Sequence, residues 1–149
     1  MFASSVLACS FAPGYRDFAL SSTRVPNTGP TPPDPDVSLL SVERGYDDGN
    51  GGSCSDAGVI TLEVGVTDFD PNIGYIVAVE SGNFPKGVLP DGIISPVNLA
   101  DGRMGFYFVW GDFSDLGYGK ESIDAVLLVR SVSSTGIESD AIKIQIKDP

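Results

Sequence analysis

Apolar and polar residues alternate with a period of two over residues 122–130 and 142–147, near the C-terminal end of the printed chain. Such alternation puts one face of a strand on a core and the other face in water. Residues 133–136, S-S-T-G, separate the two stretches, and Gly136 can adopt the positive φ that a tight turn needs. The pattern predicts a β-hairpin, whose inward-facing residues are Ile123, Ala125, Leu127, Val129, Ile142, Ile144 and Ile146.

Further short apolar stretches occur earlier in the chain, and glycines and prolines separate them. The stretches expected to form strands are residues 37–43, 59–66, 74–80 and 103–110. Prolines between residues 81 and 102 limit that region to edge strands near 93–94 and 97–99. No window of about 11–18 residues carries a helical apolar stripe. The pattern therefore predicts an all-β, antiparallel sandwich of about seven strands.

The order of these stretches resembles that of fibronectin type III and related immunoglobulin-like domains. The resemblance is clearest over residues 123–146, where an apolar strand leads into S-V-S-S-T-G-I-E-S-D and then into a regular second strand. It implies an immunoglobulin-like sandwich, which offers its edge strands and end loops to partners.

The first 36 residues differ in composition from the rest of the chain. Residues 11–36 are rich in proline, serine and threonine, which favours a semi-rigid spacer. The sequence therefore predicts a signal remnant and linker over residues 1–36 and a β-sandwich domain over residues 37–149. An alternative is that Phe11, Tyr15, Phe18 and Leu20 dock on the domain as an extra strand or a short helix.

Residues 6–9, V-L-A-C, resemble the lipobox of bacterial lipoprotein signal peptides. In that family the cysteine becomes the lipidated first residue of the mature protein. The resemblance implies a lipid anchor on Cys9, with the linker and the domain after it. We therefore expect an exported protein that is either lipid-anchored in a bacterial cell envelope or secreted.

The chain has two cysteines, Cys9 and Cys54. In an oxidising compartment they can form a disulfide that pins the N-terminal segment to the domain. Lipidation of Cys9 is the competing expectation, and it leaves Cys54 without that partner. Acidic residues around Cys54 disfavour the thiolate, so we do not expect Cys54 to act as a nucleophile.

Charge and composition exclude several functions. The net charge is −11, from 20 acidic and 9 basic residues, which opposes binding to nucleic acid and to anionic lipid. The chain has no histidine, so Ser-His-Asp and Cys-His catalysis and histidine-containing zinc sites are excluded. We expect no enzyme activity and no cofactor, and a lipid anchor as the sole membrane attachment.

Asp47, Asp48, Asn50 and Asp56 lie in a glycine-rich stretch that supplies the oxygen ligands calcium prefers. The spacing does not match the EF-hand pattern. Counted from Asp48, the fifth position needs an oxygen ligand but is Gly52, and the sixth needs a glycine but is Ser53. These residues are thus weak calcium candidates. A solvated turn is the competing interpretation, and the more favoured one.

The stretch after the 103–110 strand combines aromatic and acidic side chains, which suits a ligand-binding loop. Trp110 is in phase with Phe106 and Phe108, so the competing expectation places its ring in the core. The candidate ligand residues are Trp110, Asp112, Phe113, Asp115 and Tyr118.

From sequence alone, the expected function is that of a non-enzymatic, exported β-sandwich module, envelope-tethered or secreted, that serves as an accessory envelope protein or as a protein-binding domain. The alternative is a carbohydrate-binding module that uses the 110–118 loop. A small hydrolase with paired acids, such as Asp112 and Asp115, ranks third.

Overall fold

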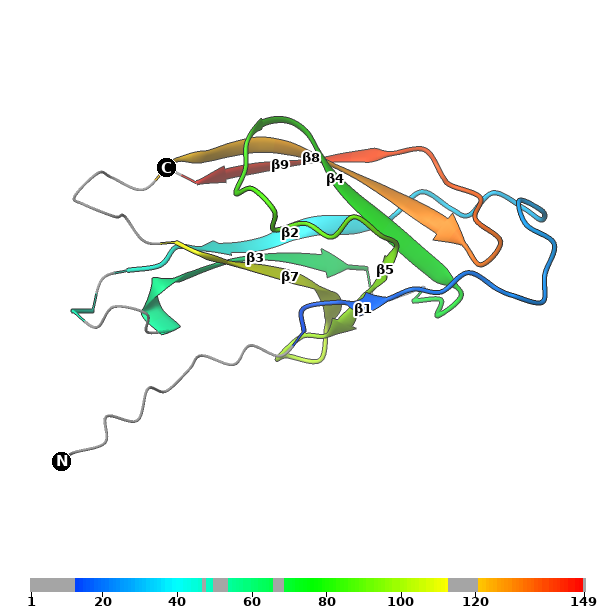
Figure 1. The fold of residues 1–149 in the computed structure, drawn as a ribbon, viewed down its shortest axis with the longest axis horizontal. Coiled ribbons are helices and arrows are strands. Elements are labelled where there is room, and N and C mark those ends of the chain that lie inside the picture. Colours follow the sequence, from blue (N-terminus) through cyan, green and yellow to red (C-terminus); the bar gives the residue numbers. More distant parts are fainter. Residues whose placement is uncertain (1–12, 47, 50–53, 66–68, 113–120, 149) are drawn as a thin grey trace.

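The computed structural model describes residues 13–46, 48–49, 54–65, 69–112 and 121–148. These residues form nine strands and one short 3-10 helix (Figure 1). In chain order the elements are β1 (Arg16–Asp17), β2 (Val37–Glu43), η1 (Cys54–Asp56), β3 (Ala57–Val64), β4 (Ile73–Asn83), β5 (Ile94–Ser95), β6 (Val97–Asn98), β7 (Met104–Gly111), β8 (Ile123–Ser133) and β9 (Ile142–Asp148).

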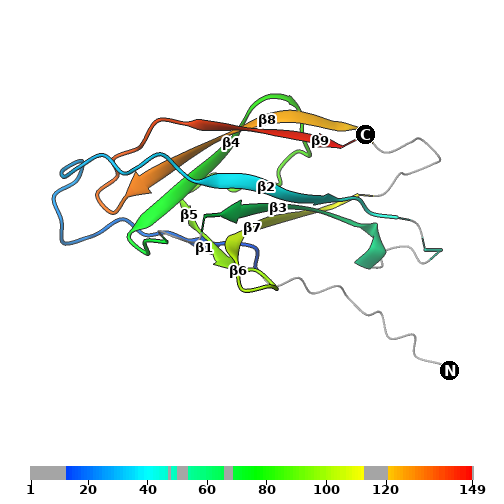
Figure 2. The ribbon, with the colours of Figure 1, turned by 180° about the vertical axis from the view of Figure 1, so that it is seen from behind.

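The strands form two antiparallel sheets that pack face to face. One sheet has the order β1-β5-β4-β8-β9 and the other β2-β3-β7-β6. The two layers can be followed from both sides in Figures 1 and 2. The predicted β-sandwich is therefore confirmed. The described residues form nine strands instead of about seven, and the count includes three pieces of two residues each: β5 and β6, near the expected edge strands, and β1, which lies in the predicted linker.

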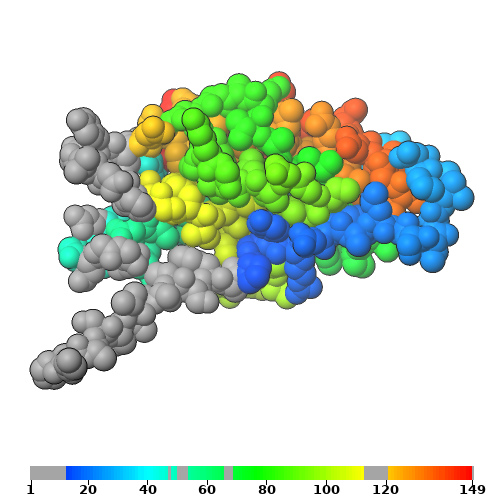
Figure 3. Space-filling model, in the orientation of Figure 1, coloured from blue at the N-terminus to red at the C-terminus, as the bar shows by residue number. Residues whose placement is uncertain are grey.

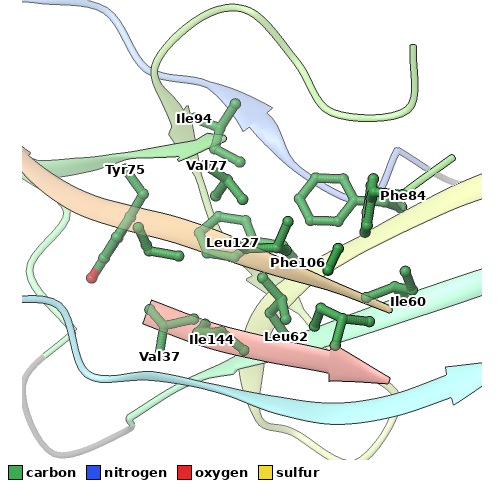
Figure 4. Packing of buried hydrophobic residues seen from close by; sticks show 14 of the residues in the cluster. Val37, Ile60, Leu62, Tyr75, Val77, Phe84, Ile94, Phe106, Leu127 and Ile144 are labelled. Carbon is green, nitrogen blue, oxygen red and sulfur yellow. The ribbon is translucent and has the colours of Figure 1, made fainter. Parts of the chain in front are cut away.

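Large apolar side chains from both sheets fill the space between the layers (Figure 4). Phe106 of β7 is fully buried, and its ring meets Tyr75 of β4 edge-on with centroids 5.5 Å apart. Phe106 also stacks on Phe108 at 6.4 Å. The Tyr75–Phe106 contact crosses from one sheet to the other, so this aromatic pair helps to hold the layers together.

The C-terminal hairpin has the predicted form. β8 and β9 pair antiparallel in a register that sets Leu127 opposite Ile144. Ile123 and Leu127 are buried, as the alternation requires. Gly136 has a φ of +96° and donates its N–H to the carbonyl of Ser133, 3.0 Å away. The turn glycine is therefore used for its conformational freedom.

Residues 14–36, here called the strap, lie along the surface of the sandwich. Figure 3 shows them, in dark to light blue, running over this face to the right-hand end of the molecule. β1 pairs with β5, and the N–H of Tyr107 donates to the carbonyl of Gly14 at 3.0 Å. The ring of Phe18 lies over Gly74. The strap thus follows the sandwich surface, and the domain boundary at residue 36 stays a prediction.

Candidate functional site

The outer edge of β4 is open over most of its length. β4 pairs with β8 from Ile73 to Asn83, but on its other side only Tyr75 pairs, with Ile94 of β5. Within the described part of the chain, no backbone hydrogen bond reaches the outer side of β4 beyond that bridge. Unpaired N–H and C=O groups along an edge can pair with another strand.

Local sequence sets where β4 begins. Asp70 closes a turn by accepting hydrogen bonds from the backbone N–H of Asn72 at 2.8 Å and from its side-chain amide at 3.1 Å. Its carbonyl also accepts the N–H of Ile73 at 3.1 Å. Asp and Asn are suited to such turns because their side chains substitute for backbone partners. The strand therefore starts at a fixed point beside the strap.

A β-bulge divides β4 into two parts. The register against β8 shifts between Val79 and Ser81. Gly82 then adopts a φ of +88°, and a Cβ there would lie 2.1 Å from the carbonyl oxygen of Asp124. A bulge bends and twists a strand. The straight part of the open edge is therefore short and covers residues 76–79.

The loop that follows β4 turns back along this open edge. Phe84 is buried in the core and Ile94 pairs with β4, so both ends of the loop are fixed. Between these anchors, Val88 and Leu89 pack partly against the core. The edge and the loop enclose a hollow of about 590 Å³. Figure 3 shows this green segment on the face that carries the strap.

The hollow is mainly apolar, with charges at its rim. Its lining includes Ile76, Val79 and Leu89. The side chain of Val79 is 43% exposed, although its position in the alternation predicts burial. Lys86 and Asp91 are exposed residues of opposite charge that also line it. The site therefore combines an unpaired strand edge with a pocket for an apolar side chain.

Comparison of the chain with protein-family models, with curated proteins and with solved structures finds no match. The part of the chain that the structure describes has no helix long and apolar enough to cross a membrane. Over the same residues, no three His, Cys, Asp or Glu side chains gather as a metal site would require.

The structure describes two of the five predicted ligand-loop residues, Trp110 and Asp112. Trp110 is half-buried and packs against the core, and its ring lies over Gly58 of β3, where a Cβ would come within 2.3 Å of it. Phe113, Asp115 and Tyr118 lie outside the described residues. The two described side chains differ in role, because Asp112 points into an ion pair.

Asp112 is 6% exposed and its carboxylate binds Arg44 through two oxygens. The Nε–Oδ2 distance is 2.7 Å and the Nη2–Oδ1 distance is 3.0 Å. The N–H of Gly45 donates to Oδ2 at 2.8 Å. Arg44 also contacts Asp148 at 2.7 Å and the carbonyl of Glu121 at 2.9 Å. This Arg44 cluster ties the ends of β2, β7 and β9 together across both sheets.

The Arg44 cluster keeps the guanidinium charged. The hydrogen bonds to Asp112 raise the pKa of Arg44 well above its ordinary value, despite the opposing effect of burial, and Asp148 adds to the increase. A carboxylate that is engaged by a bidentate arginine and a backbone donor has few lone pairs left for a ligand. The geometry thus gives Asp112 a structural role.

The remaining predicted residues are only partly described. Cys54 begins η1, and no described cysteine is free. Cys9 lies outside the described residues, so both its lipidation and the Cys9–Cys54 bridge stay predictions. Of the calcium candidates, Asp47 and Asn50 also lie outside. Asp48 is exposed, and the carbonyl of Asp56 accepts the N–H of Asp112 at 2.7 Å.

Sequence reasoning did not single out the β4 edge, although it placed a strand there. The signal was present in the sequence. Prolines at 85, 90 and 96 prevent the next segment from pairing along the whole of β4. A long strand followed by a proline-rich segment therefore indicates an edge that is left partly open.

Proposed function

We propose that this chain is a non-enzymatic β-sandwich module that binds an extended segment of a partner protein along the outer edge of β4. The observation that carries the proposal is the open edge over residues 76–79 beside an apolar hollow. An extended peptide can add to such an edge as a further strand. Its backbone would bond to β4, and one apolar side chain would enter the hollow.

The dimensions of the site support a short peptide strand. Residues 76–79 offer four positions before the bulge, which is close to the length of a short strand. Backbone hydrogen bonds give such a complex affinity, while a pocket for alternate side chains gives selectivity. Lys86 and Asp91 at the rim of the hollow would select for charges that flank the apolar residue.

The strand order supports the immunoglobulin-like, fibronectin type III-like assignment. Taking β2, β3, β4, β6, β7, β8 and β9 as strands A to G, one sheet has the order A-B-E-D and the other contains C-F-G. That is the constant-type immunoglobulin arrangement. β5 pairs with the C strand, and β1 pairs with the outer side of β5. Modules of this architecture serve many functions, so the function is inferred from the β4 site and not from the fold.

The proposed setting is the bacterial envelope or the extracellular space. It is supported by the lipobox-like residues 6–9 and by the proline-rich composition that follows them. The proposal involves no cofactor or nucleic acid, and it involves contact with a membrane only if Cys9 carries a lipid instead of a bond to Cys54. A protein partner is favoured over a glycan because Trp110 packs against the core and Asp112 is held by Arg44.

The test uses linear peptides displayed on phage and selected against the purified chain, followed by binding measurements on the enriched sequences. Val79→Lys places a charge at the open edge. Leu40→Lys is the matched control, because Leu40 is 39% exposed on β2 of the other sheet and Val79 is 43% exposed. We expect Val79→Lys to weaken binding at least tenfold and Leu40→Lys to leave it unchanged.

A glycan array run in parallel separates the two classes of partner. Enrichment of extended apolar peptides that depend on Val79 supports the proposal. Binding to a glycan without peptide enrichment would reject it in favour of the carbohydrate-binding alternative. Equal binding by the Val79→Lys and Leu40→Lys variants would also reject it, because the peptide would then sit elsewhere.

A further inference from the structure

Residues 30–35 of the strap, P-T-P-P-D-P, form what we call the proline ridge. Four of the six are proline, which fixes φ near −65°. Residues 31, 32 and 34 each precede a proline, which disfavours the helical conformation. The structure has neither helix nor strand there. These constraints together specify a polyproline II helix, which has three residues per turn and no internal hydrogen bonds.

Burial along the proline ridge follows the same period of three. Pro32 and Pro35 are buried, whereas the other ridge residues are exposed. In a helix with three residues per turn, residues three apart lie on the same side. The side of Pro32 and Pro35 is therefore docked on the sandwich. The side that carries Pro30 and Pro33 faces solvent.

Hydrogen bonds to the body of the sandwich hold both ends of the proline ridge. At one end the hydroxyl of Thr135, a residue only 9% exposed, donates to the carbonyl of Thr28 at 2.6 Å. At the other end the N–H of Gly65 donates to the carbonyl of Asp36 at 2.8 Å. Among the described contacts, no hydrogen bond uses the backbone of residues 30–35. The ridge is therefore preorganised, with carbonyls available as acceptors.

The surroundings of the proline ridge are hollowed and bear exposed acids. A hollow of about 520 Å³ lies beside the proline ridge, and its lining includes Val25, Pro30 and Ile73. Val25 is 68% exposed, which makes it one of the most accessible apolar side chains in the described chain. Asp34 is exposed on the ridge itself, and the whole chain carries a net charge of −11.

We propose that the proline ridge is itself a ligand, recognised by a partner domain that has an aromatic-lined groove with a basic rim. Aromatic faces pack against proline rings such as those of Pro30 and Pro33, and tryptophan or tyrosine donors bond to the free carbonyls. Basic side chains at the rim would face Asp34. Because the ridge is already ordered, binding immobilises little of the chain.

This surface is separate from the β4 edge, because the hollow beside the proline ridge shares no lining residue with the hollow beside β4. The two proposals can therefore fail independently. Val79→Lys should leave binding at the ridge unchanged. A Pro30→Ala/Pro33→Ala double variant should leave peptide binding at the β4 edge unchanged.

The test measures binding of the purified chain to three polyproline-binding domains of the SH3, WW and EVH1 classes by NMR titration. The variant is Pro30→Ala/Pro33→Ala, and the control is Pro13→Ala, an exposed proline beside a different hollow. A second probe is each domain with its groove aromatic changed to alanine. Circular dichroism checks that the folded sandwich is retained in both variants.

We expect at least one domain to bind saturably, with a Kd in the micromolar range, about −8 kcal/mol. The double variant should weaken that binding at least tenfold, Pro13→Ala should not, and the groove alanine should abolish it. Absence of saturable binding by all three domains overturns the proposal. So does binding that is equal for the wild-type chain and the double variant.

Discussion

Replacing Arg44 with methionine tests whether the Arg44 cluster holds the two sheets together. The change keeps a long apolar stem and removes the guanidinium. Asp112, which is 6% exposed, would lose the two hydrogen bonds that Arg44 donates to its carboxylate and would retain the one from the N–H of Gly45. Breaking a buried ion pair by removing one partner costs about 3–5 kcal/mol. Arg44 is 19% exposed, which admits some water, so we expect a loss of about 2–3 kcal/mol.

The assay is unfolding by urea. The expected result is a lower midpoint urea concentration, with an unchanged slope of the free energy of unfolding against urea concentration. Arg103→Met is the control, because Arg103 is 43% exposed and its contacts with Glu63 and Asp101 lie in water. We expect that variant to lose less than about 0.5 kcal/mol. The Arg44→Met and Asp112→Asn single variants should each lower the free energy of unfolding. The sum of these two losses should exceed the loss in the double variant by about 1 kcal/mol or more.

The effect of Arg44→Met should not depend on pH across the neutral and mildly alkaline range. A group whose pKa is higher in the folded state than in the unfolded state stabilises the fold. That stabilisation is complete below the unfolded-state pKa and is lost as the pH rises through the folded-state pKa. Both values for Arg44 lie above the working range, so its contribution stays constant there. A loss below about 1 kcal/mol, or additive single variants, would refute this account of the cluster.

Three further predictions concern the core, the bulge and alkaline pH. Phe106→Ala should cost about 3–5 kcal/mol in urea unfolding, because Phe106 is fully buried, and a smaller loss would show that the layers pack without it. Gly82→Ala should lower the free energy of unfolding by about 1–3 kcal/mol, because φ is +88° and the new Cβ would meet the carbonyl of Asp124. Gly92→Ala is the control and should be nearly neutral, because no atom lies near the position of its Cβ. Burial, followed by nearby acidic charges, raises the pKa of Tyr75. Tyr75 therefore contributes stability fully below about pH 10 and loses it as pH rises through its folded pKa. The free energy of unfolding of the wild type relative to Tyr75→Phe should fall above about pH 10. A difference that does not change with pH would contradict the raised pKa of Tyr75.

The alternation of apolar residues was enough to predict the sandwich and its C-terminal hairpin. It placed the first long strand at residues 37–43, and β2 has those bounds. It ended the 74–80 strand too early, because the S-G-N of residues 81–83 is typical of a turn, yet β4 continues to Asn83. Pairing with β8 across the bulge extends the strand, and that pairing depends on a distant partner.

The candidate sites were harder to predict because they depend on contacts between residues far apart in sequence. Asp112 looked like a loop ligand, but Arg44, 68 positions away, binds its carboxylate. The sequence allowed two positions for Trp110, in a ligand-binding loop or in the core. In the structure its side chain packs against the core. Val79 is exposed although it is in phase with buried Tyr75 and Val77, and it lies where the register of β4 against β8 shifts, which local sequence does not specify.

An NMR structure of the chain with a peptide selected on it would show directly whether residues 76–79 form the binding site. We expect intermolecular contacts between backbone protons of the peptide and those of residues 76–79, in the pattern of an added strand. We also expect contacts from one apolar peptide side chain to Val79 and Leu89. Contacts confined to the 110–118 loop, with residues 76–79 unaffected, would contradict the proposal that the β4 edge is the binding site.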